Sequence, residues 1–179
     1  MNNKKKSLVI TTIASSKNYI LKKYAKISLK ENVDFIIIGD KKSPSNFFLR
    51  GANFFSLNKQ RSLKFHLSKI LPINHYSRKN LGYLIAMKKN PEMIIETDDD
   101  NLPLKNFFLK KKIGVEYSYH SKKAGWVNVY KKYTKKNIWP RGFALEKLNS
   151  PLTKKFTLLK MKYPIQQGLA DKNPDVDAI

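Results

Sequence analysis

Three of the thirteen acidic residues of this sequence stand side by side, as Asp98, Asp99 and Asp100, directly after a short apolar run. Adjacent carboxylates repel one another unless a cation or water neutralises them. In an extended segment, residues two apart point to the same side, so we expect Asp98 and Asp100 to face one pocket and Asp99 to turn aside. Two such carboxylates suit Mg²⁺ or Mn²⁺, which take further ligands from water and substrate phosphates. The run therefore predicts a site for a metal and a diphosphate, with a solvated acidic turn as the alternative.

A basic stretch precedes the acidic run, at the start of a helix predicted over residues 76–90, and contains Arg78, Lys79 and Asn80. Cations and the free N–H groups of a helix start can together hold a phosphate, although charged residues at helix starts also commonly face solvent. Asp40 follows an earlier predicted strand, where we expect it to accept hydrogen bonds from the base and ribose of a nucleotide. Arg78 would then meet the diphosphate at the other end of the same pocket.

Two later segments also carry side chains suited to chemistry. Trp139 and Arg141 flank a proline in the stretch NIWPRGF. An aromatic face beside a guanidinium suits a sugar ring or a base, although a Trp-Pro turn packed for stability is as common. The C-terminal stretch gathers Asp171, Asp175 and Asp177, any of which could act as a general base or a further metal ligand. We take Asp175 and Asp177 as the candidate catalytic residues.

The elements that must position these residues alternate between strand and helix. Apolar runs predict strands over 7–13, 33–40, 53–57 and 93–95, and helical spacing of apolar residues predicts helices over 19–30, 60–71 and 76–90. Alternation of this kind is typical of an α/β fold with a mainly parallel sheet flanked by helices. Ligands bind beyond the carboxyl ends of such strands, and both Asp40 and the acidic run lie at predicted strand ends. We expect one domain over residues 1–179, whose nucleotide-binding half is 1–101 and whose later part, 102–179, elaborates it.

Composition narrows the function classes. The 36 Lys and Arg residues give a formal net charge of +23, which favours phosphates, nucleic acid or an anionic membrane face, although a lysine-rich composition bias would produce the same number. The absence of cysteine excludes disulfides, thiolate metal sites and a cysteine nucleophile. No Gly-rich dinucleotide fingerprint or P-loop is present, and no apolar run approaches the roughly 20 residues of a membrane span. We expect a cytoplasmic protein that associates peripherally with the anionic inner face of a membrane.

Longer blocks of the sequence carry a resemblance. The stretch YSRKNLGYLIAMKKNPEMIIETDDDN, followed by VNVY, IWPRGFALEKL and IQQGLADKNPDVDAI, resembles the STELLO-type glycosyltransferase family, known from plants and also found in bacteria and nematodes. The resemblance implies a GT-A fold, a nucleotide-sugar donor and a divalent metal held at a D-x-D motif. Asp98 and Asp100 match that motif, Arg78 and Lys79 match the SRKN block, and Trp139–Phe143 matches the WPRGF block.

The same resemblance implies that residues 102–179 form the half that binds the sugar and the acceptor. Family members continue past the final acidic block, whereas this sequence stops at Ile179, so we expect that half to be incomplete. The expected function is metal-dependent transfer of a sugar from a nucleotide-sugar donor to a glycan or lipid-linked acceptor in surface polysaccharide synthesis. Two alternatives are a non-catalytic GT-A-like subunit and a basic nucleic-acid-binding protein.

Overall fold

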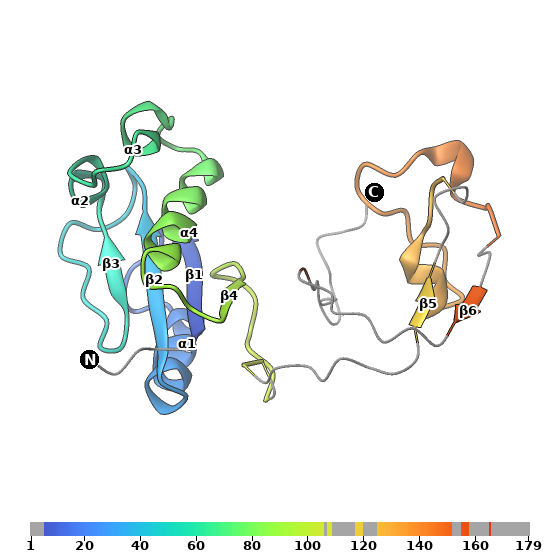
Figure 1. The fold of residues 1–179 in the computed structure, drawn as a ribbon, viewed down its shortest axis with the longest axis horizontal. Coiled ribbons are helices and arrows are strands. Elements are labelled where there is room, and N and C mark those ends of the chain that lie inside the picture. The colour runs from blue at the N-terminus through green and yellow to red at the C-terminus, as the bar shows by residue number, and fades with distance from the viewer. Residues whose placement is uncertain are drawn as a thin grey trace. The chain divides into compact units, whose positions relative to one another are not determined.

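The computed structural model describes residues 6–105, 107–108, 117–119, 125–151, 155–157 and 165. The chain divides into two compact units, Met1–Leu109 and Lys110–Ile179, and each unit has its own sheet (Figure 1). The boundary falls shortly after residue 101, where the sequence pattern weakens.

The first unit is built on a four-stranded sheet in the order β3-β2-β1-β4. Its strands are β1 (Lys6–Thr12), β2 (Val33–Gly39), β3 (Asn53–Phe55) and β4 (Met93–Glu96). All three strand pairs are parallel, and β1 pairs with β2 along its whole length and with β4 over its first four residues. The predicted α/β fold with a parallel sheet and flanking helices is confirmed.

Helices lie along the chain between β1 and β2 and between β3 and β4, as is usual for parallel strands, whereas a loop without a helix, residues 40–52, joins β2 to β3. The helix predicted over 19–30 has the predicted bounds, because the Asn18 side chain caps it by accepting a hydrogen bond from the Leu21 N–H. The helix predicted over 60–71 is two short helices instead. The first begins early, after the cap residue Ser56, and the second stops where Leu71 adopts the extended backbone favoured before a proline. The helices of this unit are α1 (Tyr19–Lys30), α2 (Leu57–Arg61), α3 (Leu67–Ile70), the 3₁₀ turn η1 (Tyr76–Arg78) and α4 (Lys79–Met87).

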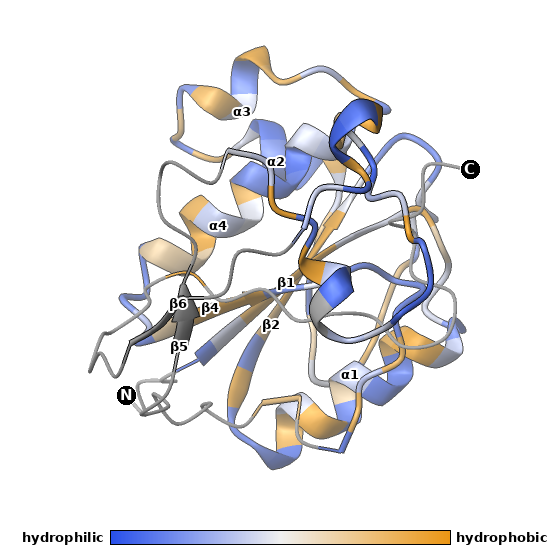
Figure 2. Cartoon of the chain, turned by 90° about the vertical axis from the view of Figure 1, so that its right-hand side faces the viewer, coloured by the Kyte–Doolittle hydropathy of each residue, from blue (hydrophilic) through white to orange (hydrophobic). Residues whose placement is uncertain are grey.

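The core of the first unit lies on both faces of the sheet. On one face, alternate residues of β1 and β2 pack with Leu21 and Tyr24 of α1, and on the other face the intervening residues pack with Ile85 of α4. Figure 2 shows the apolar central strands between these two helices. Every residue of β2 is buried, which explains why its sequence is apolar on both faces rather than alternating. The exception is Asp34, whose buried carboxylate lies 2.7 Å from the Lys89 ammonium. The packing on both faces fixes the order and direction of the strands, and with them the edge at which their carboxyl ends lie.

The second unit contains a two-stranded antiparallel sheet of β5 (Tyr117–Tyr119) and β6 (Lys155–Thr157). The described residues that lie between these strands in the sequence include the 3₁₀ turns η3 (Val129–Lys132) and η4 (Leu145–Lys147). Among the residues of this unit whose burial is described, Asn128 is the one buried residue, and its amide donates to the Ile138 carbonyl at 2.9 Å. No helix in the described part of the chain is long and apolar enough to span a membrane.

Candidate functional site

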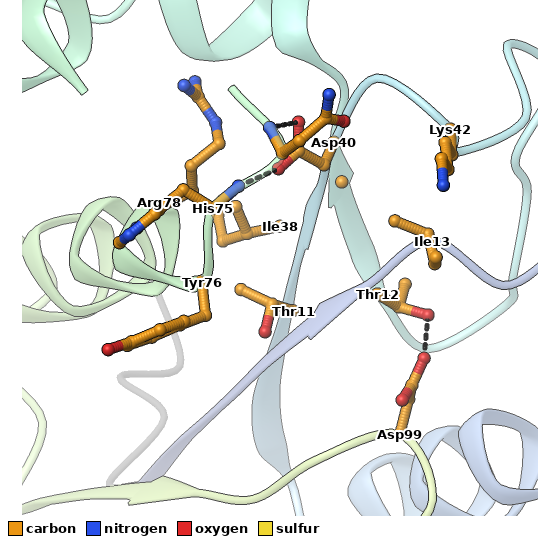
Figure 3. A pocket seen from close by; sticks show the side chains of 12 residues that line it. Thr11, Thr12, Ile13, Ile38, Asp40, Lys42, His75, Tyr76, Arg78 and Asp99 are labelled. Carbon is orange, nitrogen blue, oxygen red and sulfur yellow. Dashed lines mark hydrogen bonds between the residues drawn. The ribbon is translucent and has the colours of Figure 1, made fainter. Parts of the chain in front are cut away.

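The carboxyl end of β1 lies at the point where the chain changes direction in the sheet. The chain continues from β1 to β2 and β3 on one side, and later returns to place β4 on the other side of β1. Open parallel sheets bind ligands in the crevice at such a switch point. A pocket of about 430 Å³ opens there (Figure 3). Its lining residues come from the ends of β1 and β2, the loops that follow them, η1 with the two residues before it, and the turn after β4: Thr11, Thr12, Ile13, Ile38, Gly39, Asp40, Lys42, Asn74, His75, Tyr76, Arg78 and Asp99.

Asp99 is the acidic-run residue that lines this pocket. Its carboxylate accepts a hydrogen bond from the Thr12 hydroxyl at the end of β1 (Figure 3). The expectation that Asp99 turns aside is therefore wrong. The reason is that β4 ends at Glu96 and residues 98–100 form a turn, whereas two-residue alternation holds only in extended backbone.

Asp98 is paired with a cation from α4. The Lys79 ammonium lies 2.7 Å from an Asp98 carboxylate oxygen and 3.3 Å from a Glu96 oxygen, and it donates to the Thr97 carbonyl at 3.3 Å. Burial lowers the pKa of Lys79, but these two carboxylates outweigh burial and raise the pKa above its ordinary value. Lys79 thus neutralises part of the acidic run, so the mutual repulsion of these carboxylates is relieved within the protein.

The rest of the turn is held from α1. The Tyr24 hydroxyl donates to the Asn101 carbonyl at 2.8 Å, and the Asn18 amide donates to the Asp99 carbonyl at 3.5 Å. Burial raises the pKa of Tyr24, so its hydroxyl remains a donor at neutral pH. Asp100 is exposed and makes no hydrogen bond or ion pair with the described residues. The acidic turn is therefore fixed at its ends, and within the described part of the chain Asp100 is its unpaired carboxylate.

These carboxylates supply the hard oxygen donors that Mg²⁺ and Mn²⁺ prefer. No three His, Cys, Asp or Glu residues in the described part of the chain are grouped closely enough to enclose a metal ion. The donor set fits a cation that takes only one or two ligands from the protein and the rest from water and phosphate. Metal binding by Asp98 and Asp100 stays a prediction.

Asp40 holds the opposite wall of the pocket. Its carboxylate accepts hydrogen bonds from the backbone N–H groups of Lys41, Asn74 and His75 at 2.7, 2.8 and 3.1 Å. A carboxylate offers about four lone-pair sites, so one remains for a ligand. Asp40 therefore fixes the local backbone, and its predicted contact with a nucleoside stays a prediction.

Arg78 lines the pocket, but its guanidinium is engaged inside the protein. Its Nε donates to the Gln60 side-chain oxygen at 2.8 Å, and its Nη1 donates to the carbonyls of Leu71 and Pro72 at 3.1 and 3.2 Å. Burial lowers the pKa of Arg78, with the nearby Asp40 charge acting in the opposite direction. Nη2 is buried without a hydrogen-bond partner among the described residues. This geometry suits a residue that positions the pocket wall more than one that contacts a phosphate.

Lys42 is a second cation that lines the pocket, and it differs from Arg78 in its contacts. It follows β2 in the loop after Asp40, it is exposed, and it makes no hydrogen bond or ion pair with the described residues. Because Arg78 and Lys79 are both engaged in internal contacts, Lys42 is the lining cation best placed to meet an anionic ligand. Its position could not be predicted from the sequence, because Lys42 is one of many scattered lysines and only the folded structure brings it to the pocket.

Of the other predicted site residues, the structure describes Asn80, Trp139 and Arg141. Asn80 is exposed on α4 and does not line the pocket. Trp139 and Arg141 belong to the second unit, where the Trp139 indole N–H donates to the Phe143 carbonyl at 2.8 Å. Asp175 and Asp177 lie outside the described residues. The roles predicted for these residues stay predictions.

Sequence reasoning also missed Thr12 and Tyr76. A signal for the first existed: two polar threonines end an otherwise apolar strand, and the end of a parallel strand is where ligands bind. Tyr76 had no such signal, because an aromatic residue near a helix start more often belongs to a core.

Comparison with known proteins supports the resemblance seen in the sequence blocks. No family model matches the chain. Two curated relatives do: "Probable glycosyltransferase STELLO2" of Arabidopsis thaliana is 28% identical over 158 residues, and "Probable glycosyltransferase STELLO1" of the same plant is 27% identical over 158 residues. Each alignment covers 80% of this chain but only 21% and 20% of the relative, so the chain spans about a fifth of their length. The predicted similarity to STELLO-type glycosyltransferases is confirmed.

Proposed function

We propose that this protein is a glycosyltransferase that binds a nucleotide-sugar donor at the carboxyl ends of β1, β2 and β4. The observation that carries the proposal is the pocket at the switch point of the sheet, which an acidic turn enters through Asp99. The names of the two relatives support the reaction class. We propose further that the sheet is the nucleotide-binding part of a GT-A-like fold.

The donor's diphosphate is the group that the pocket's charges suit. Lys42 lines the pocket with an ammonium that no other described residue pairs, and a contact between such a cation and a phosphate is stronger than a neutral hydrogen bond. A divalent Mn²⁺ or Mg²⁺ would take one or two ligands from the acidic turn, from Asp98 and Asp100 or from the pocket-lining Asp99, and the rest from water and phosphate. When bound, such an ion neutralises charge that develops on a leaving diphosphate.

The protein's own residues keep this arrangement in place. Thr12 binds the Asp99 carboxylate and Lys79 binds Asp98, so the turn is ordered before a ligand arrives and less entropy is lost on binding. Asp40 holds the wall that carries His75. Asp175 or Asp177 would serve as the base that activates an acceptor hydroxyl, and Trp139 and Arg141 would contact the sugar.

Isothermal titration with UDP and GDP, each with Mn²⁺ and with a chelator, tests this proposal. We expect binding that requires the metal, and release of the nucleoside diphosphate from a nucleotide sugar when an acceptor is present. Metal-dependent binding without any turnover would favour a non-catalytic subunit. Absence of nucleotide binding together with salt-sensitive binding to unrelated DNA would contradict the proposal and favour a nucleic-acid-binding protein.

The acceptor that we propose is a glycan or a lipid-linked glycan of a surface polysaccharide. The net charge of +23 would bring the protein to the anionic cytoplasmic face of a membrane, where each surface cation contributes on the order of 1 kcal/mol. Sedimentation with anionic vesicles, and not with neutral ones, is the expected result, and high salt should reverse it. Pelleting that salt does not reverse would speak against electrostatic association.

A further inference from the structure

We propose that Tyr76 is an aromatic platform on which the base of the donor nucleotide stacks. This inference rests on the proposed function, because it assigns one part of the donor to one wall of the same pocket. It adds a specific contact that neither the sequence blocks nor the names of the relatives indicate.

Tyr76 combines high exposure with a position in the pocket. Its side chain is 82% exposed although it is large and partly apolar, and it lines the pocket beside Thr11. One face of its ring stacks on the His75 ring, with centroids 4.8 Å apart and an angle of 18° between the planes. A flat ligand placed on the other face would extend an existing stack and remove that face from water.

The residues on either side of Tyr76 are held by hydrogen bonds. The His75 backbone N–H donates to Asp40 at 3.1 Å, and the His75 Nδ1 lies 2.7 Å from the Ser77 hydroxyl and accepts from the Ser77 N–H at 3.1 Å. Arg78, which follows directly, is buried and anchored to Gln60. Because the residues around Tyr76 are already fixed, a stacked ligand would lose less of its binding energy to ordering the protein.

The distribution of charge orients the donor. Figure 3 shows Tyr76 on one side of Thr11 and Lys42 on the other, with Asp99 below Thr12. A nucleotide is anionic at its phosphates and flat and uncharged at its base, so the phosphates suit the side with Lys42 and Asp99, and the base suits the aromatic side. Stacking tolerates any base because each has a π face, so Tyr76 would supply affinity and leave discrimination between bases to polar groups.

The experiment measures binding of UDP, GDP and inorganic pyrophosphate, all with Mn²⁺, to the full chain and its variants. We expect Tyr76→Ala to weaken binding of both nucleotides by about 5- to 150-fold, the range for loss of one stacked base, and to leave pyrophosphate binding within about twofold. Tyr76→Phe keeps the ring and should bind like the unmodified protein. Tyr19→Ala is the matched control, because Tyr19 is also an exposed tyrosine of this unit (62%) and does not line the pocket.

Three results would overturn the inference. Equal weakening of pyrophosphate and nucleotides by Tyr76→Ala would show that the residue shapes the pocket rather than stacking on a base. Unchanged nucleotide binding in Tyr76→Ala would show that no base stacks on Tyr76, and would leave the proposed donor site untouched. Failure of the unmodified protein to bind either nucleotide, with pyrophosphate bound or not, would overturn the proposed function and the platform with it.

Discussion

The two charged segments that meet at the pocket, the helix start at 75–80 and the acidic turn at 97–101, differ in how much of their charge remains available. Arg78 and Lys79 of the first segment are engaged in contacts within the protein. In the second segment Asp99 lines the pocket, and its carboxylate accepts a hydrogen bond from the Thr12 hydroxyl. Asp100 is unpaired among the described residues. A charged residue near a site is therefore not evidence of a ligand contact until its internal partners are known.

The largest effect that we expect is a loss of stability when a residue of the first segment is replaced. We expect Arg78→Ala to lower the free energy of unfolding by about 3 kcal/mol, because Gln60 and two carbonyls lose their donor in a buried place. Arg78→Lys should recover only part of this, since an ammonium cannot reproduce the fork of the guanidinium. Urea unfolding measures both, with the exposed Arg50→Ala as control. Unchanged stability with lost nucleotide binding would instead make Arg78 a phosphate ligand.

The next effect is on binding at the acidic turn. We expect Asp99→Asn to weaken Mn²⁺-dependent UDP binding by about 10- to 100-fold, since it removes the pocket-facing charge and a charged contact contributes about 1.5–3 kcal/mol. Asp100→Asn should weaken it less. Titration calorimetry on both variants makes the comparison. The reverse order would mean that the two-residue alternation expected from the sequence holds in the nucleotide-bound protein.

Lys42 extends the comparison to the loop after β2. Lys42→Ala should weaken binding of UDP and of pyrophosphate by about tenfold, and flatten the dependence of binding on salt, because a free cation near the phosphates is lost. Lys41→Ala is a closely matched control, since this neighbouring lysine is also exposed and does not line the pocket. Equal effects of the two changes would point to general attraction by the surface charge.

The smallest effect concerns the ion pair that joins the two segments. The pKa of Lys79 is raised above 10.5 in the folded protein, so its pairing stabilises the fold fully below pH 10.5 and is lost as the pH rises through the folded-state pKa. We expect Lys79→Met to lower the free energy of unfolding by less than about 1 kcal/mol at pH 8. That difference from the unmodified protein should shrink above pH 10.5.

Urea unfolding of the unmodified protein and of Lys79→Met, at pH 8 and at pH 11, measures this difference. Lys22→Met, on the exposed face of α1, is the control. A difference that does not change with pH would assign the effect to packing of the lysine's methylene groups.

The parts of the fold that follow from local pattern could be predicted from the sequence. The largely apolar VDFIIIG is a strand buried at every position, and the helix at 19–30 begins after its own cap residue, Asn18. The signals for both lie within a few consecutive residues. The position of the pocket also follows, because parallel strands place their carboxyl ends at one edge of the sheet.

The orientation of individual site residues could not be predicted in the same way. Arg78 is buried because Gln60, 18 residues earlier, and the turn at 71–72 surround its guanidinium. Asp99 faces the pocket because β4 ends at Glu96, and the place where a strand ends is poorly marked in sequence. Each of these outcomes depends on tertiary partners for which the local sequence carries no signal.

The hydrogen bond between Thr12 and Asp99 joins residues 87 positions apart in the sequence. Closing so long a loop costs chain entropy before the contacts between its ends form. We therefore expect contacts between such distant residues to form late in folding. β4 pairs with β1 over only four residues, whereas β1 and β2 pair over seven. The acidic turn should therefore open in local fluctuations more often than the sheet centre. Hydrogen exchange at residues 94–99 should accordingly be faster than in β2, and a nucleotide bound with its metal should slow it.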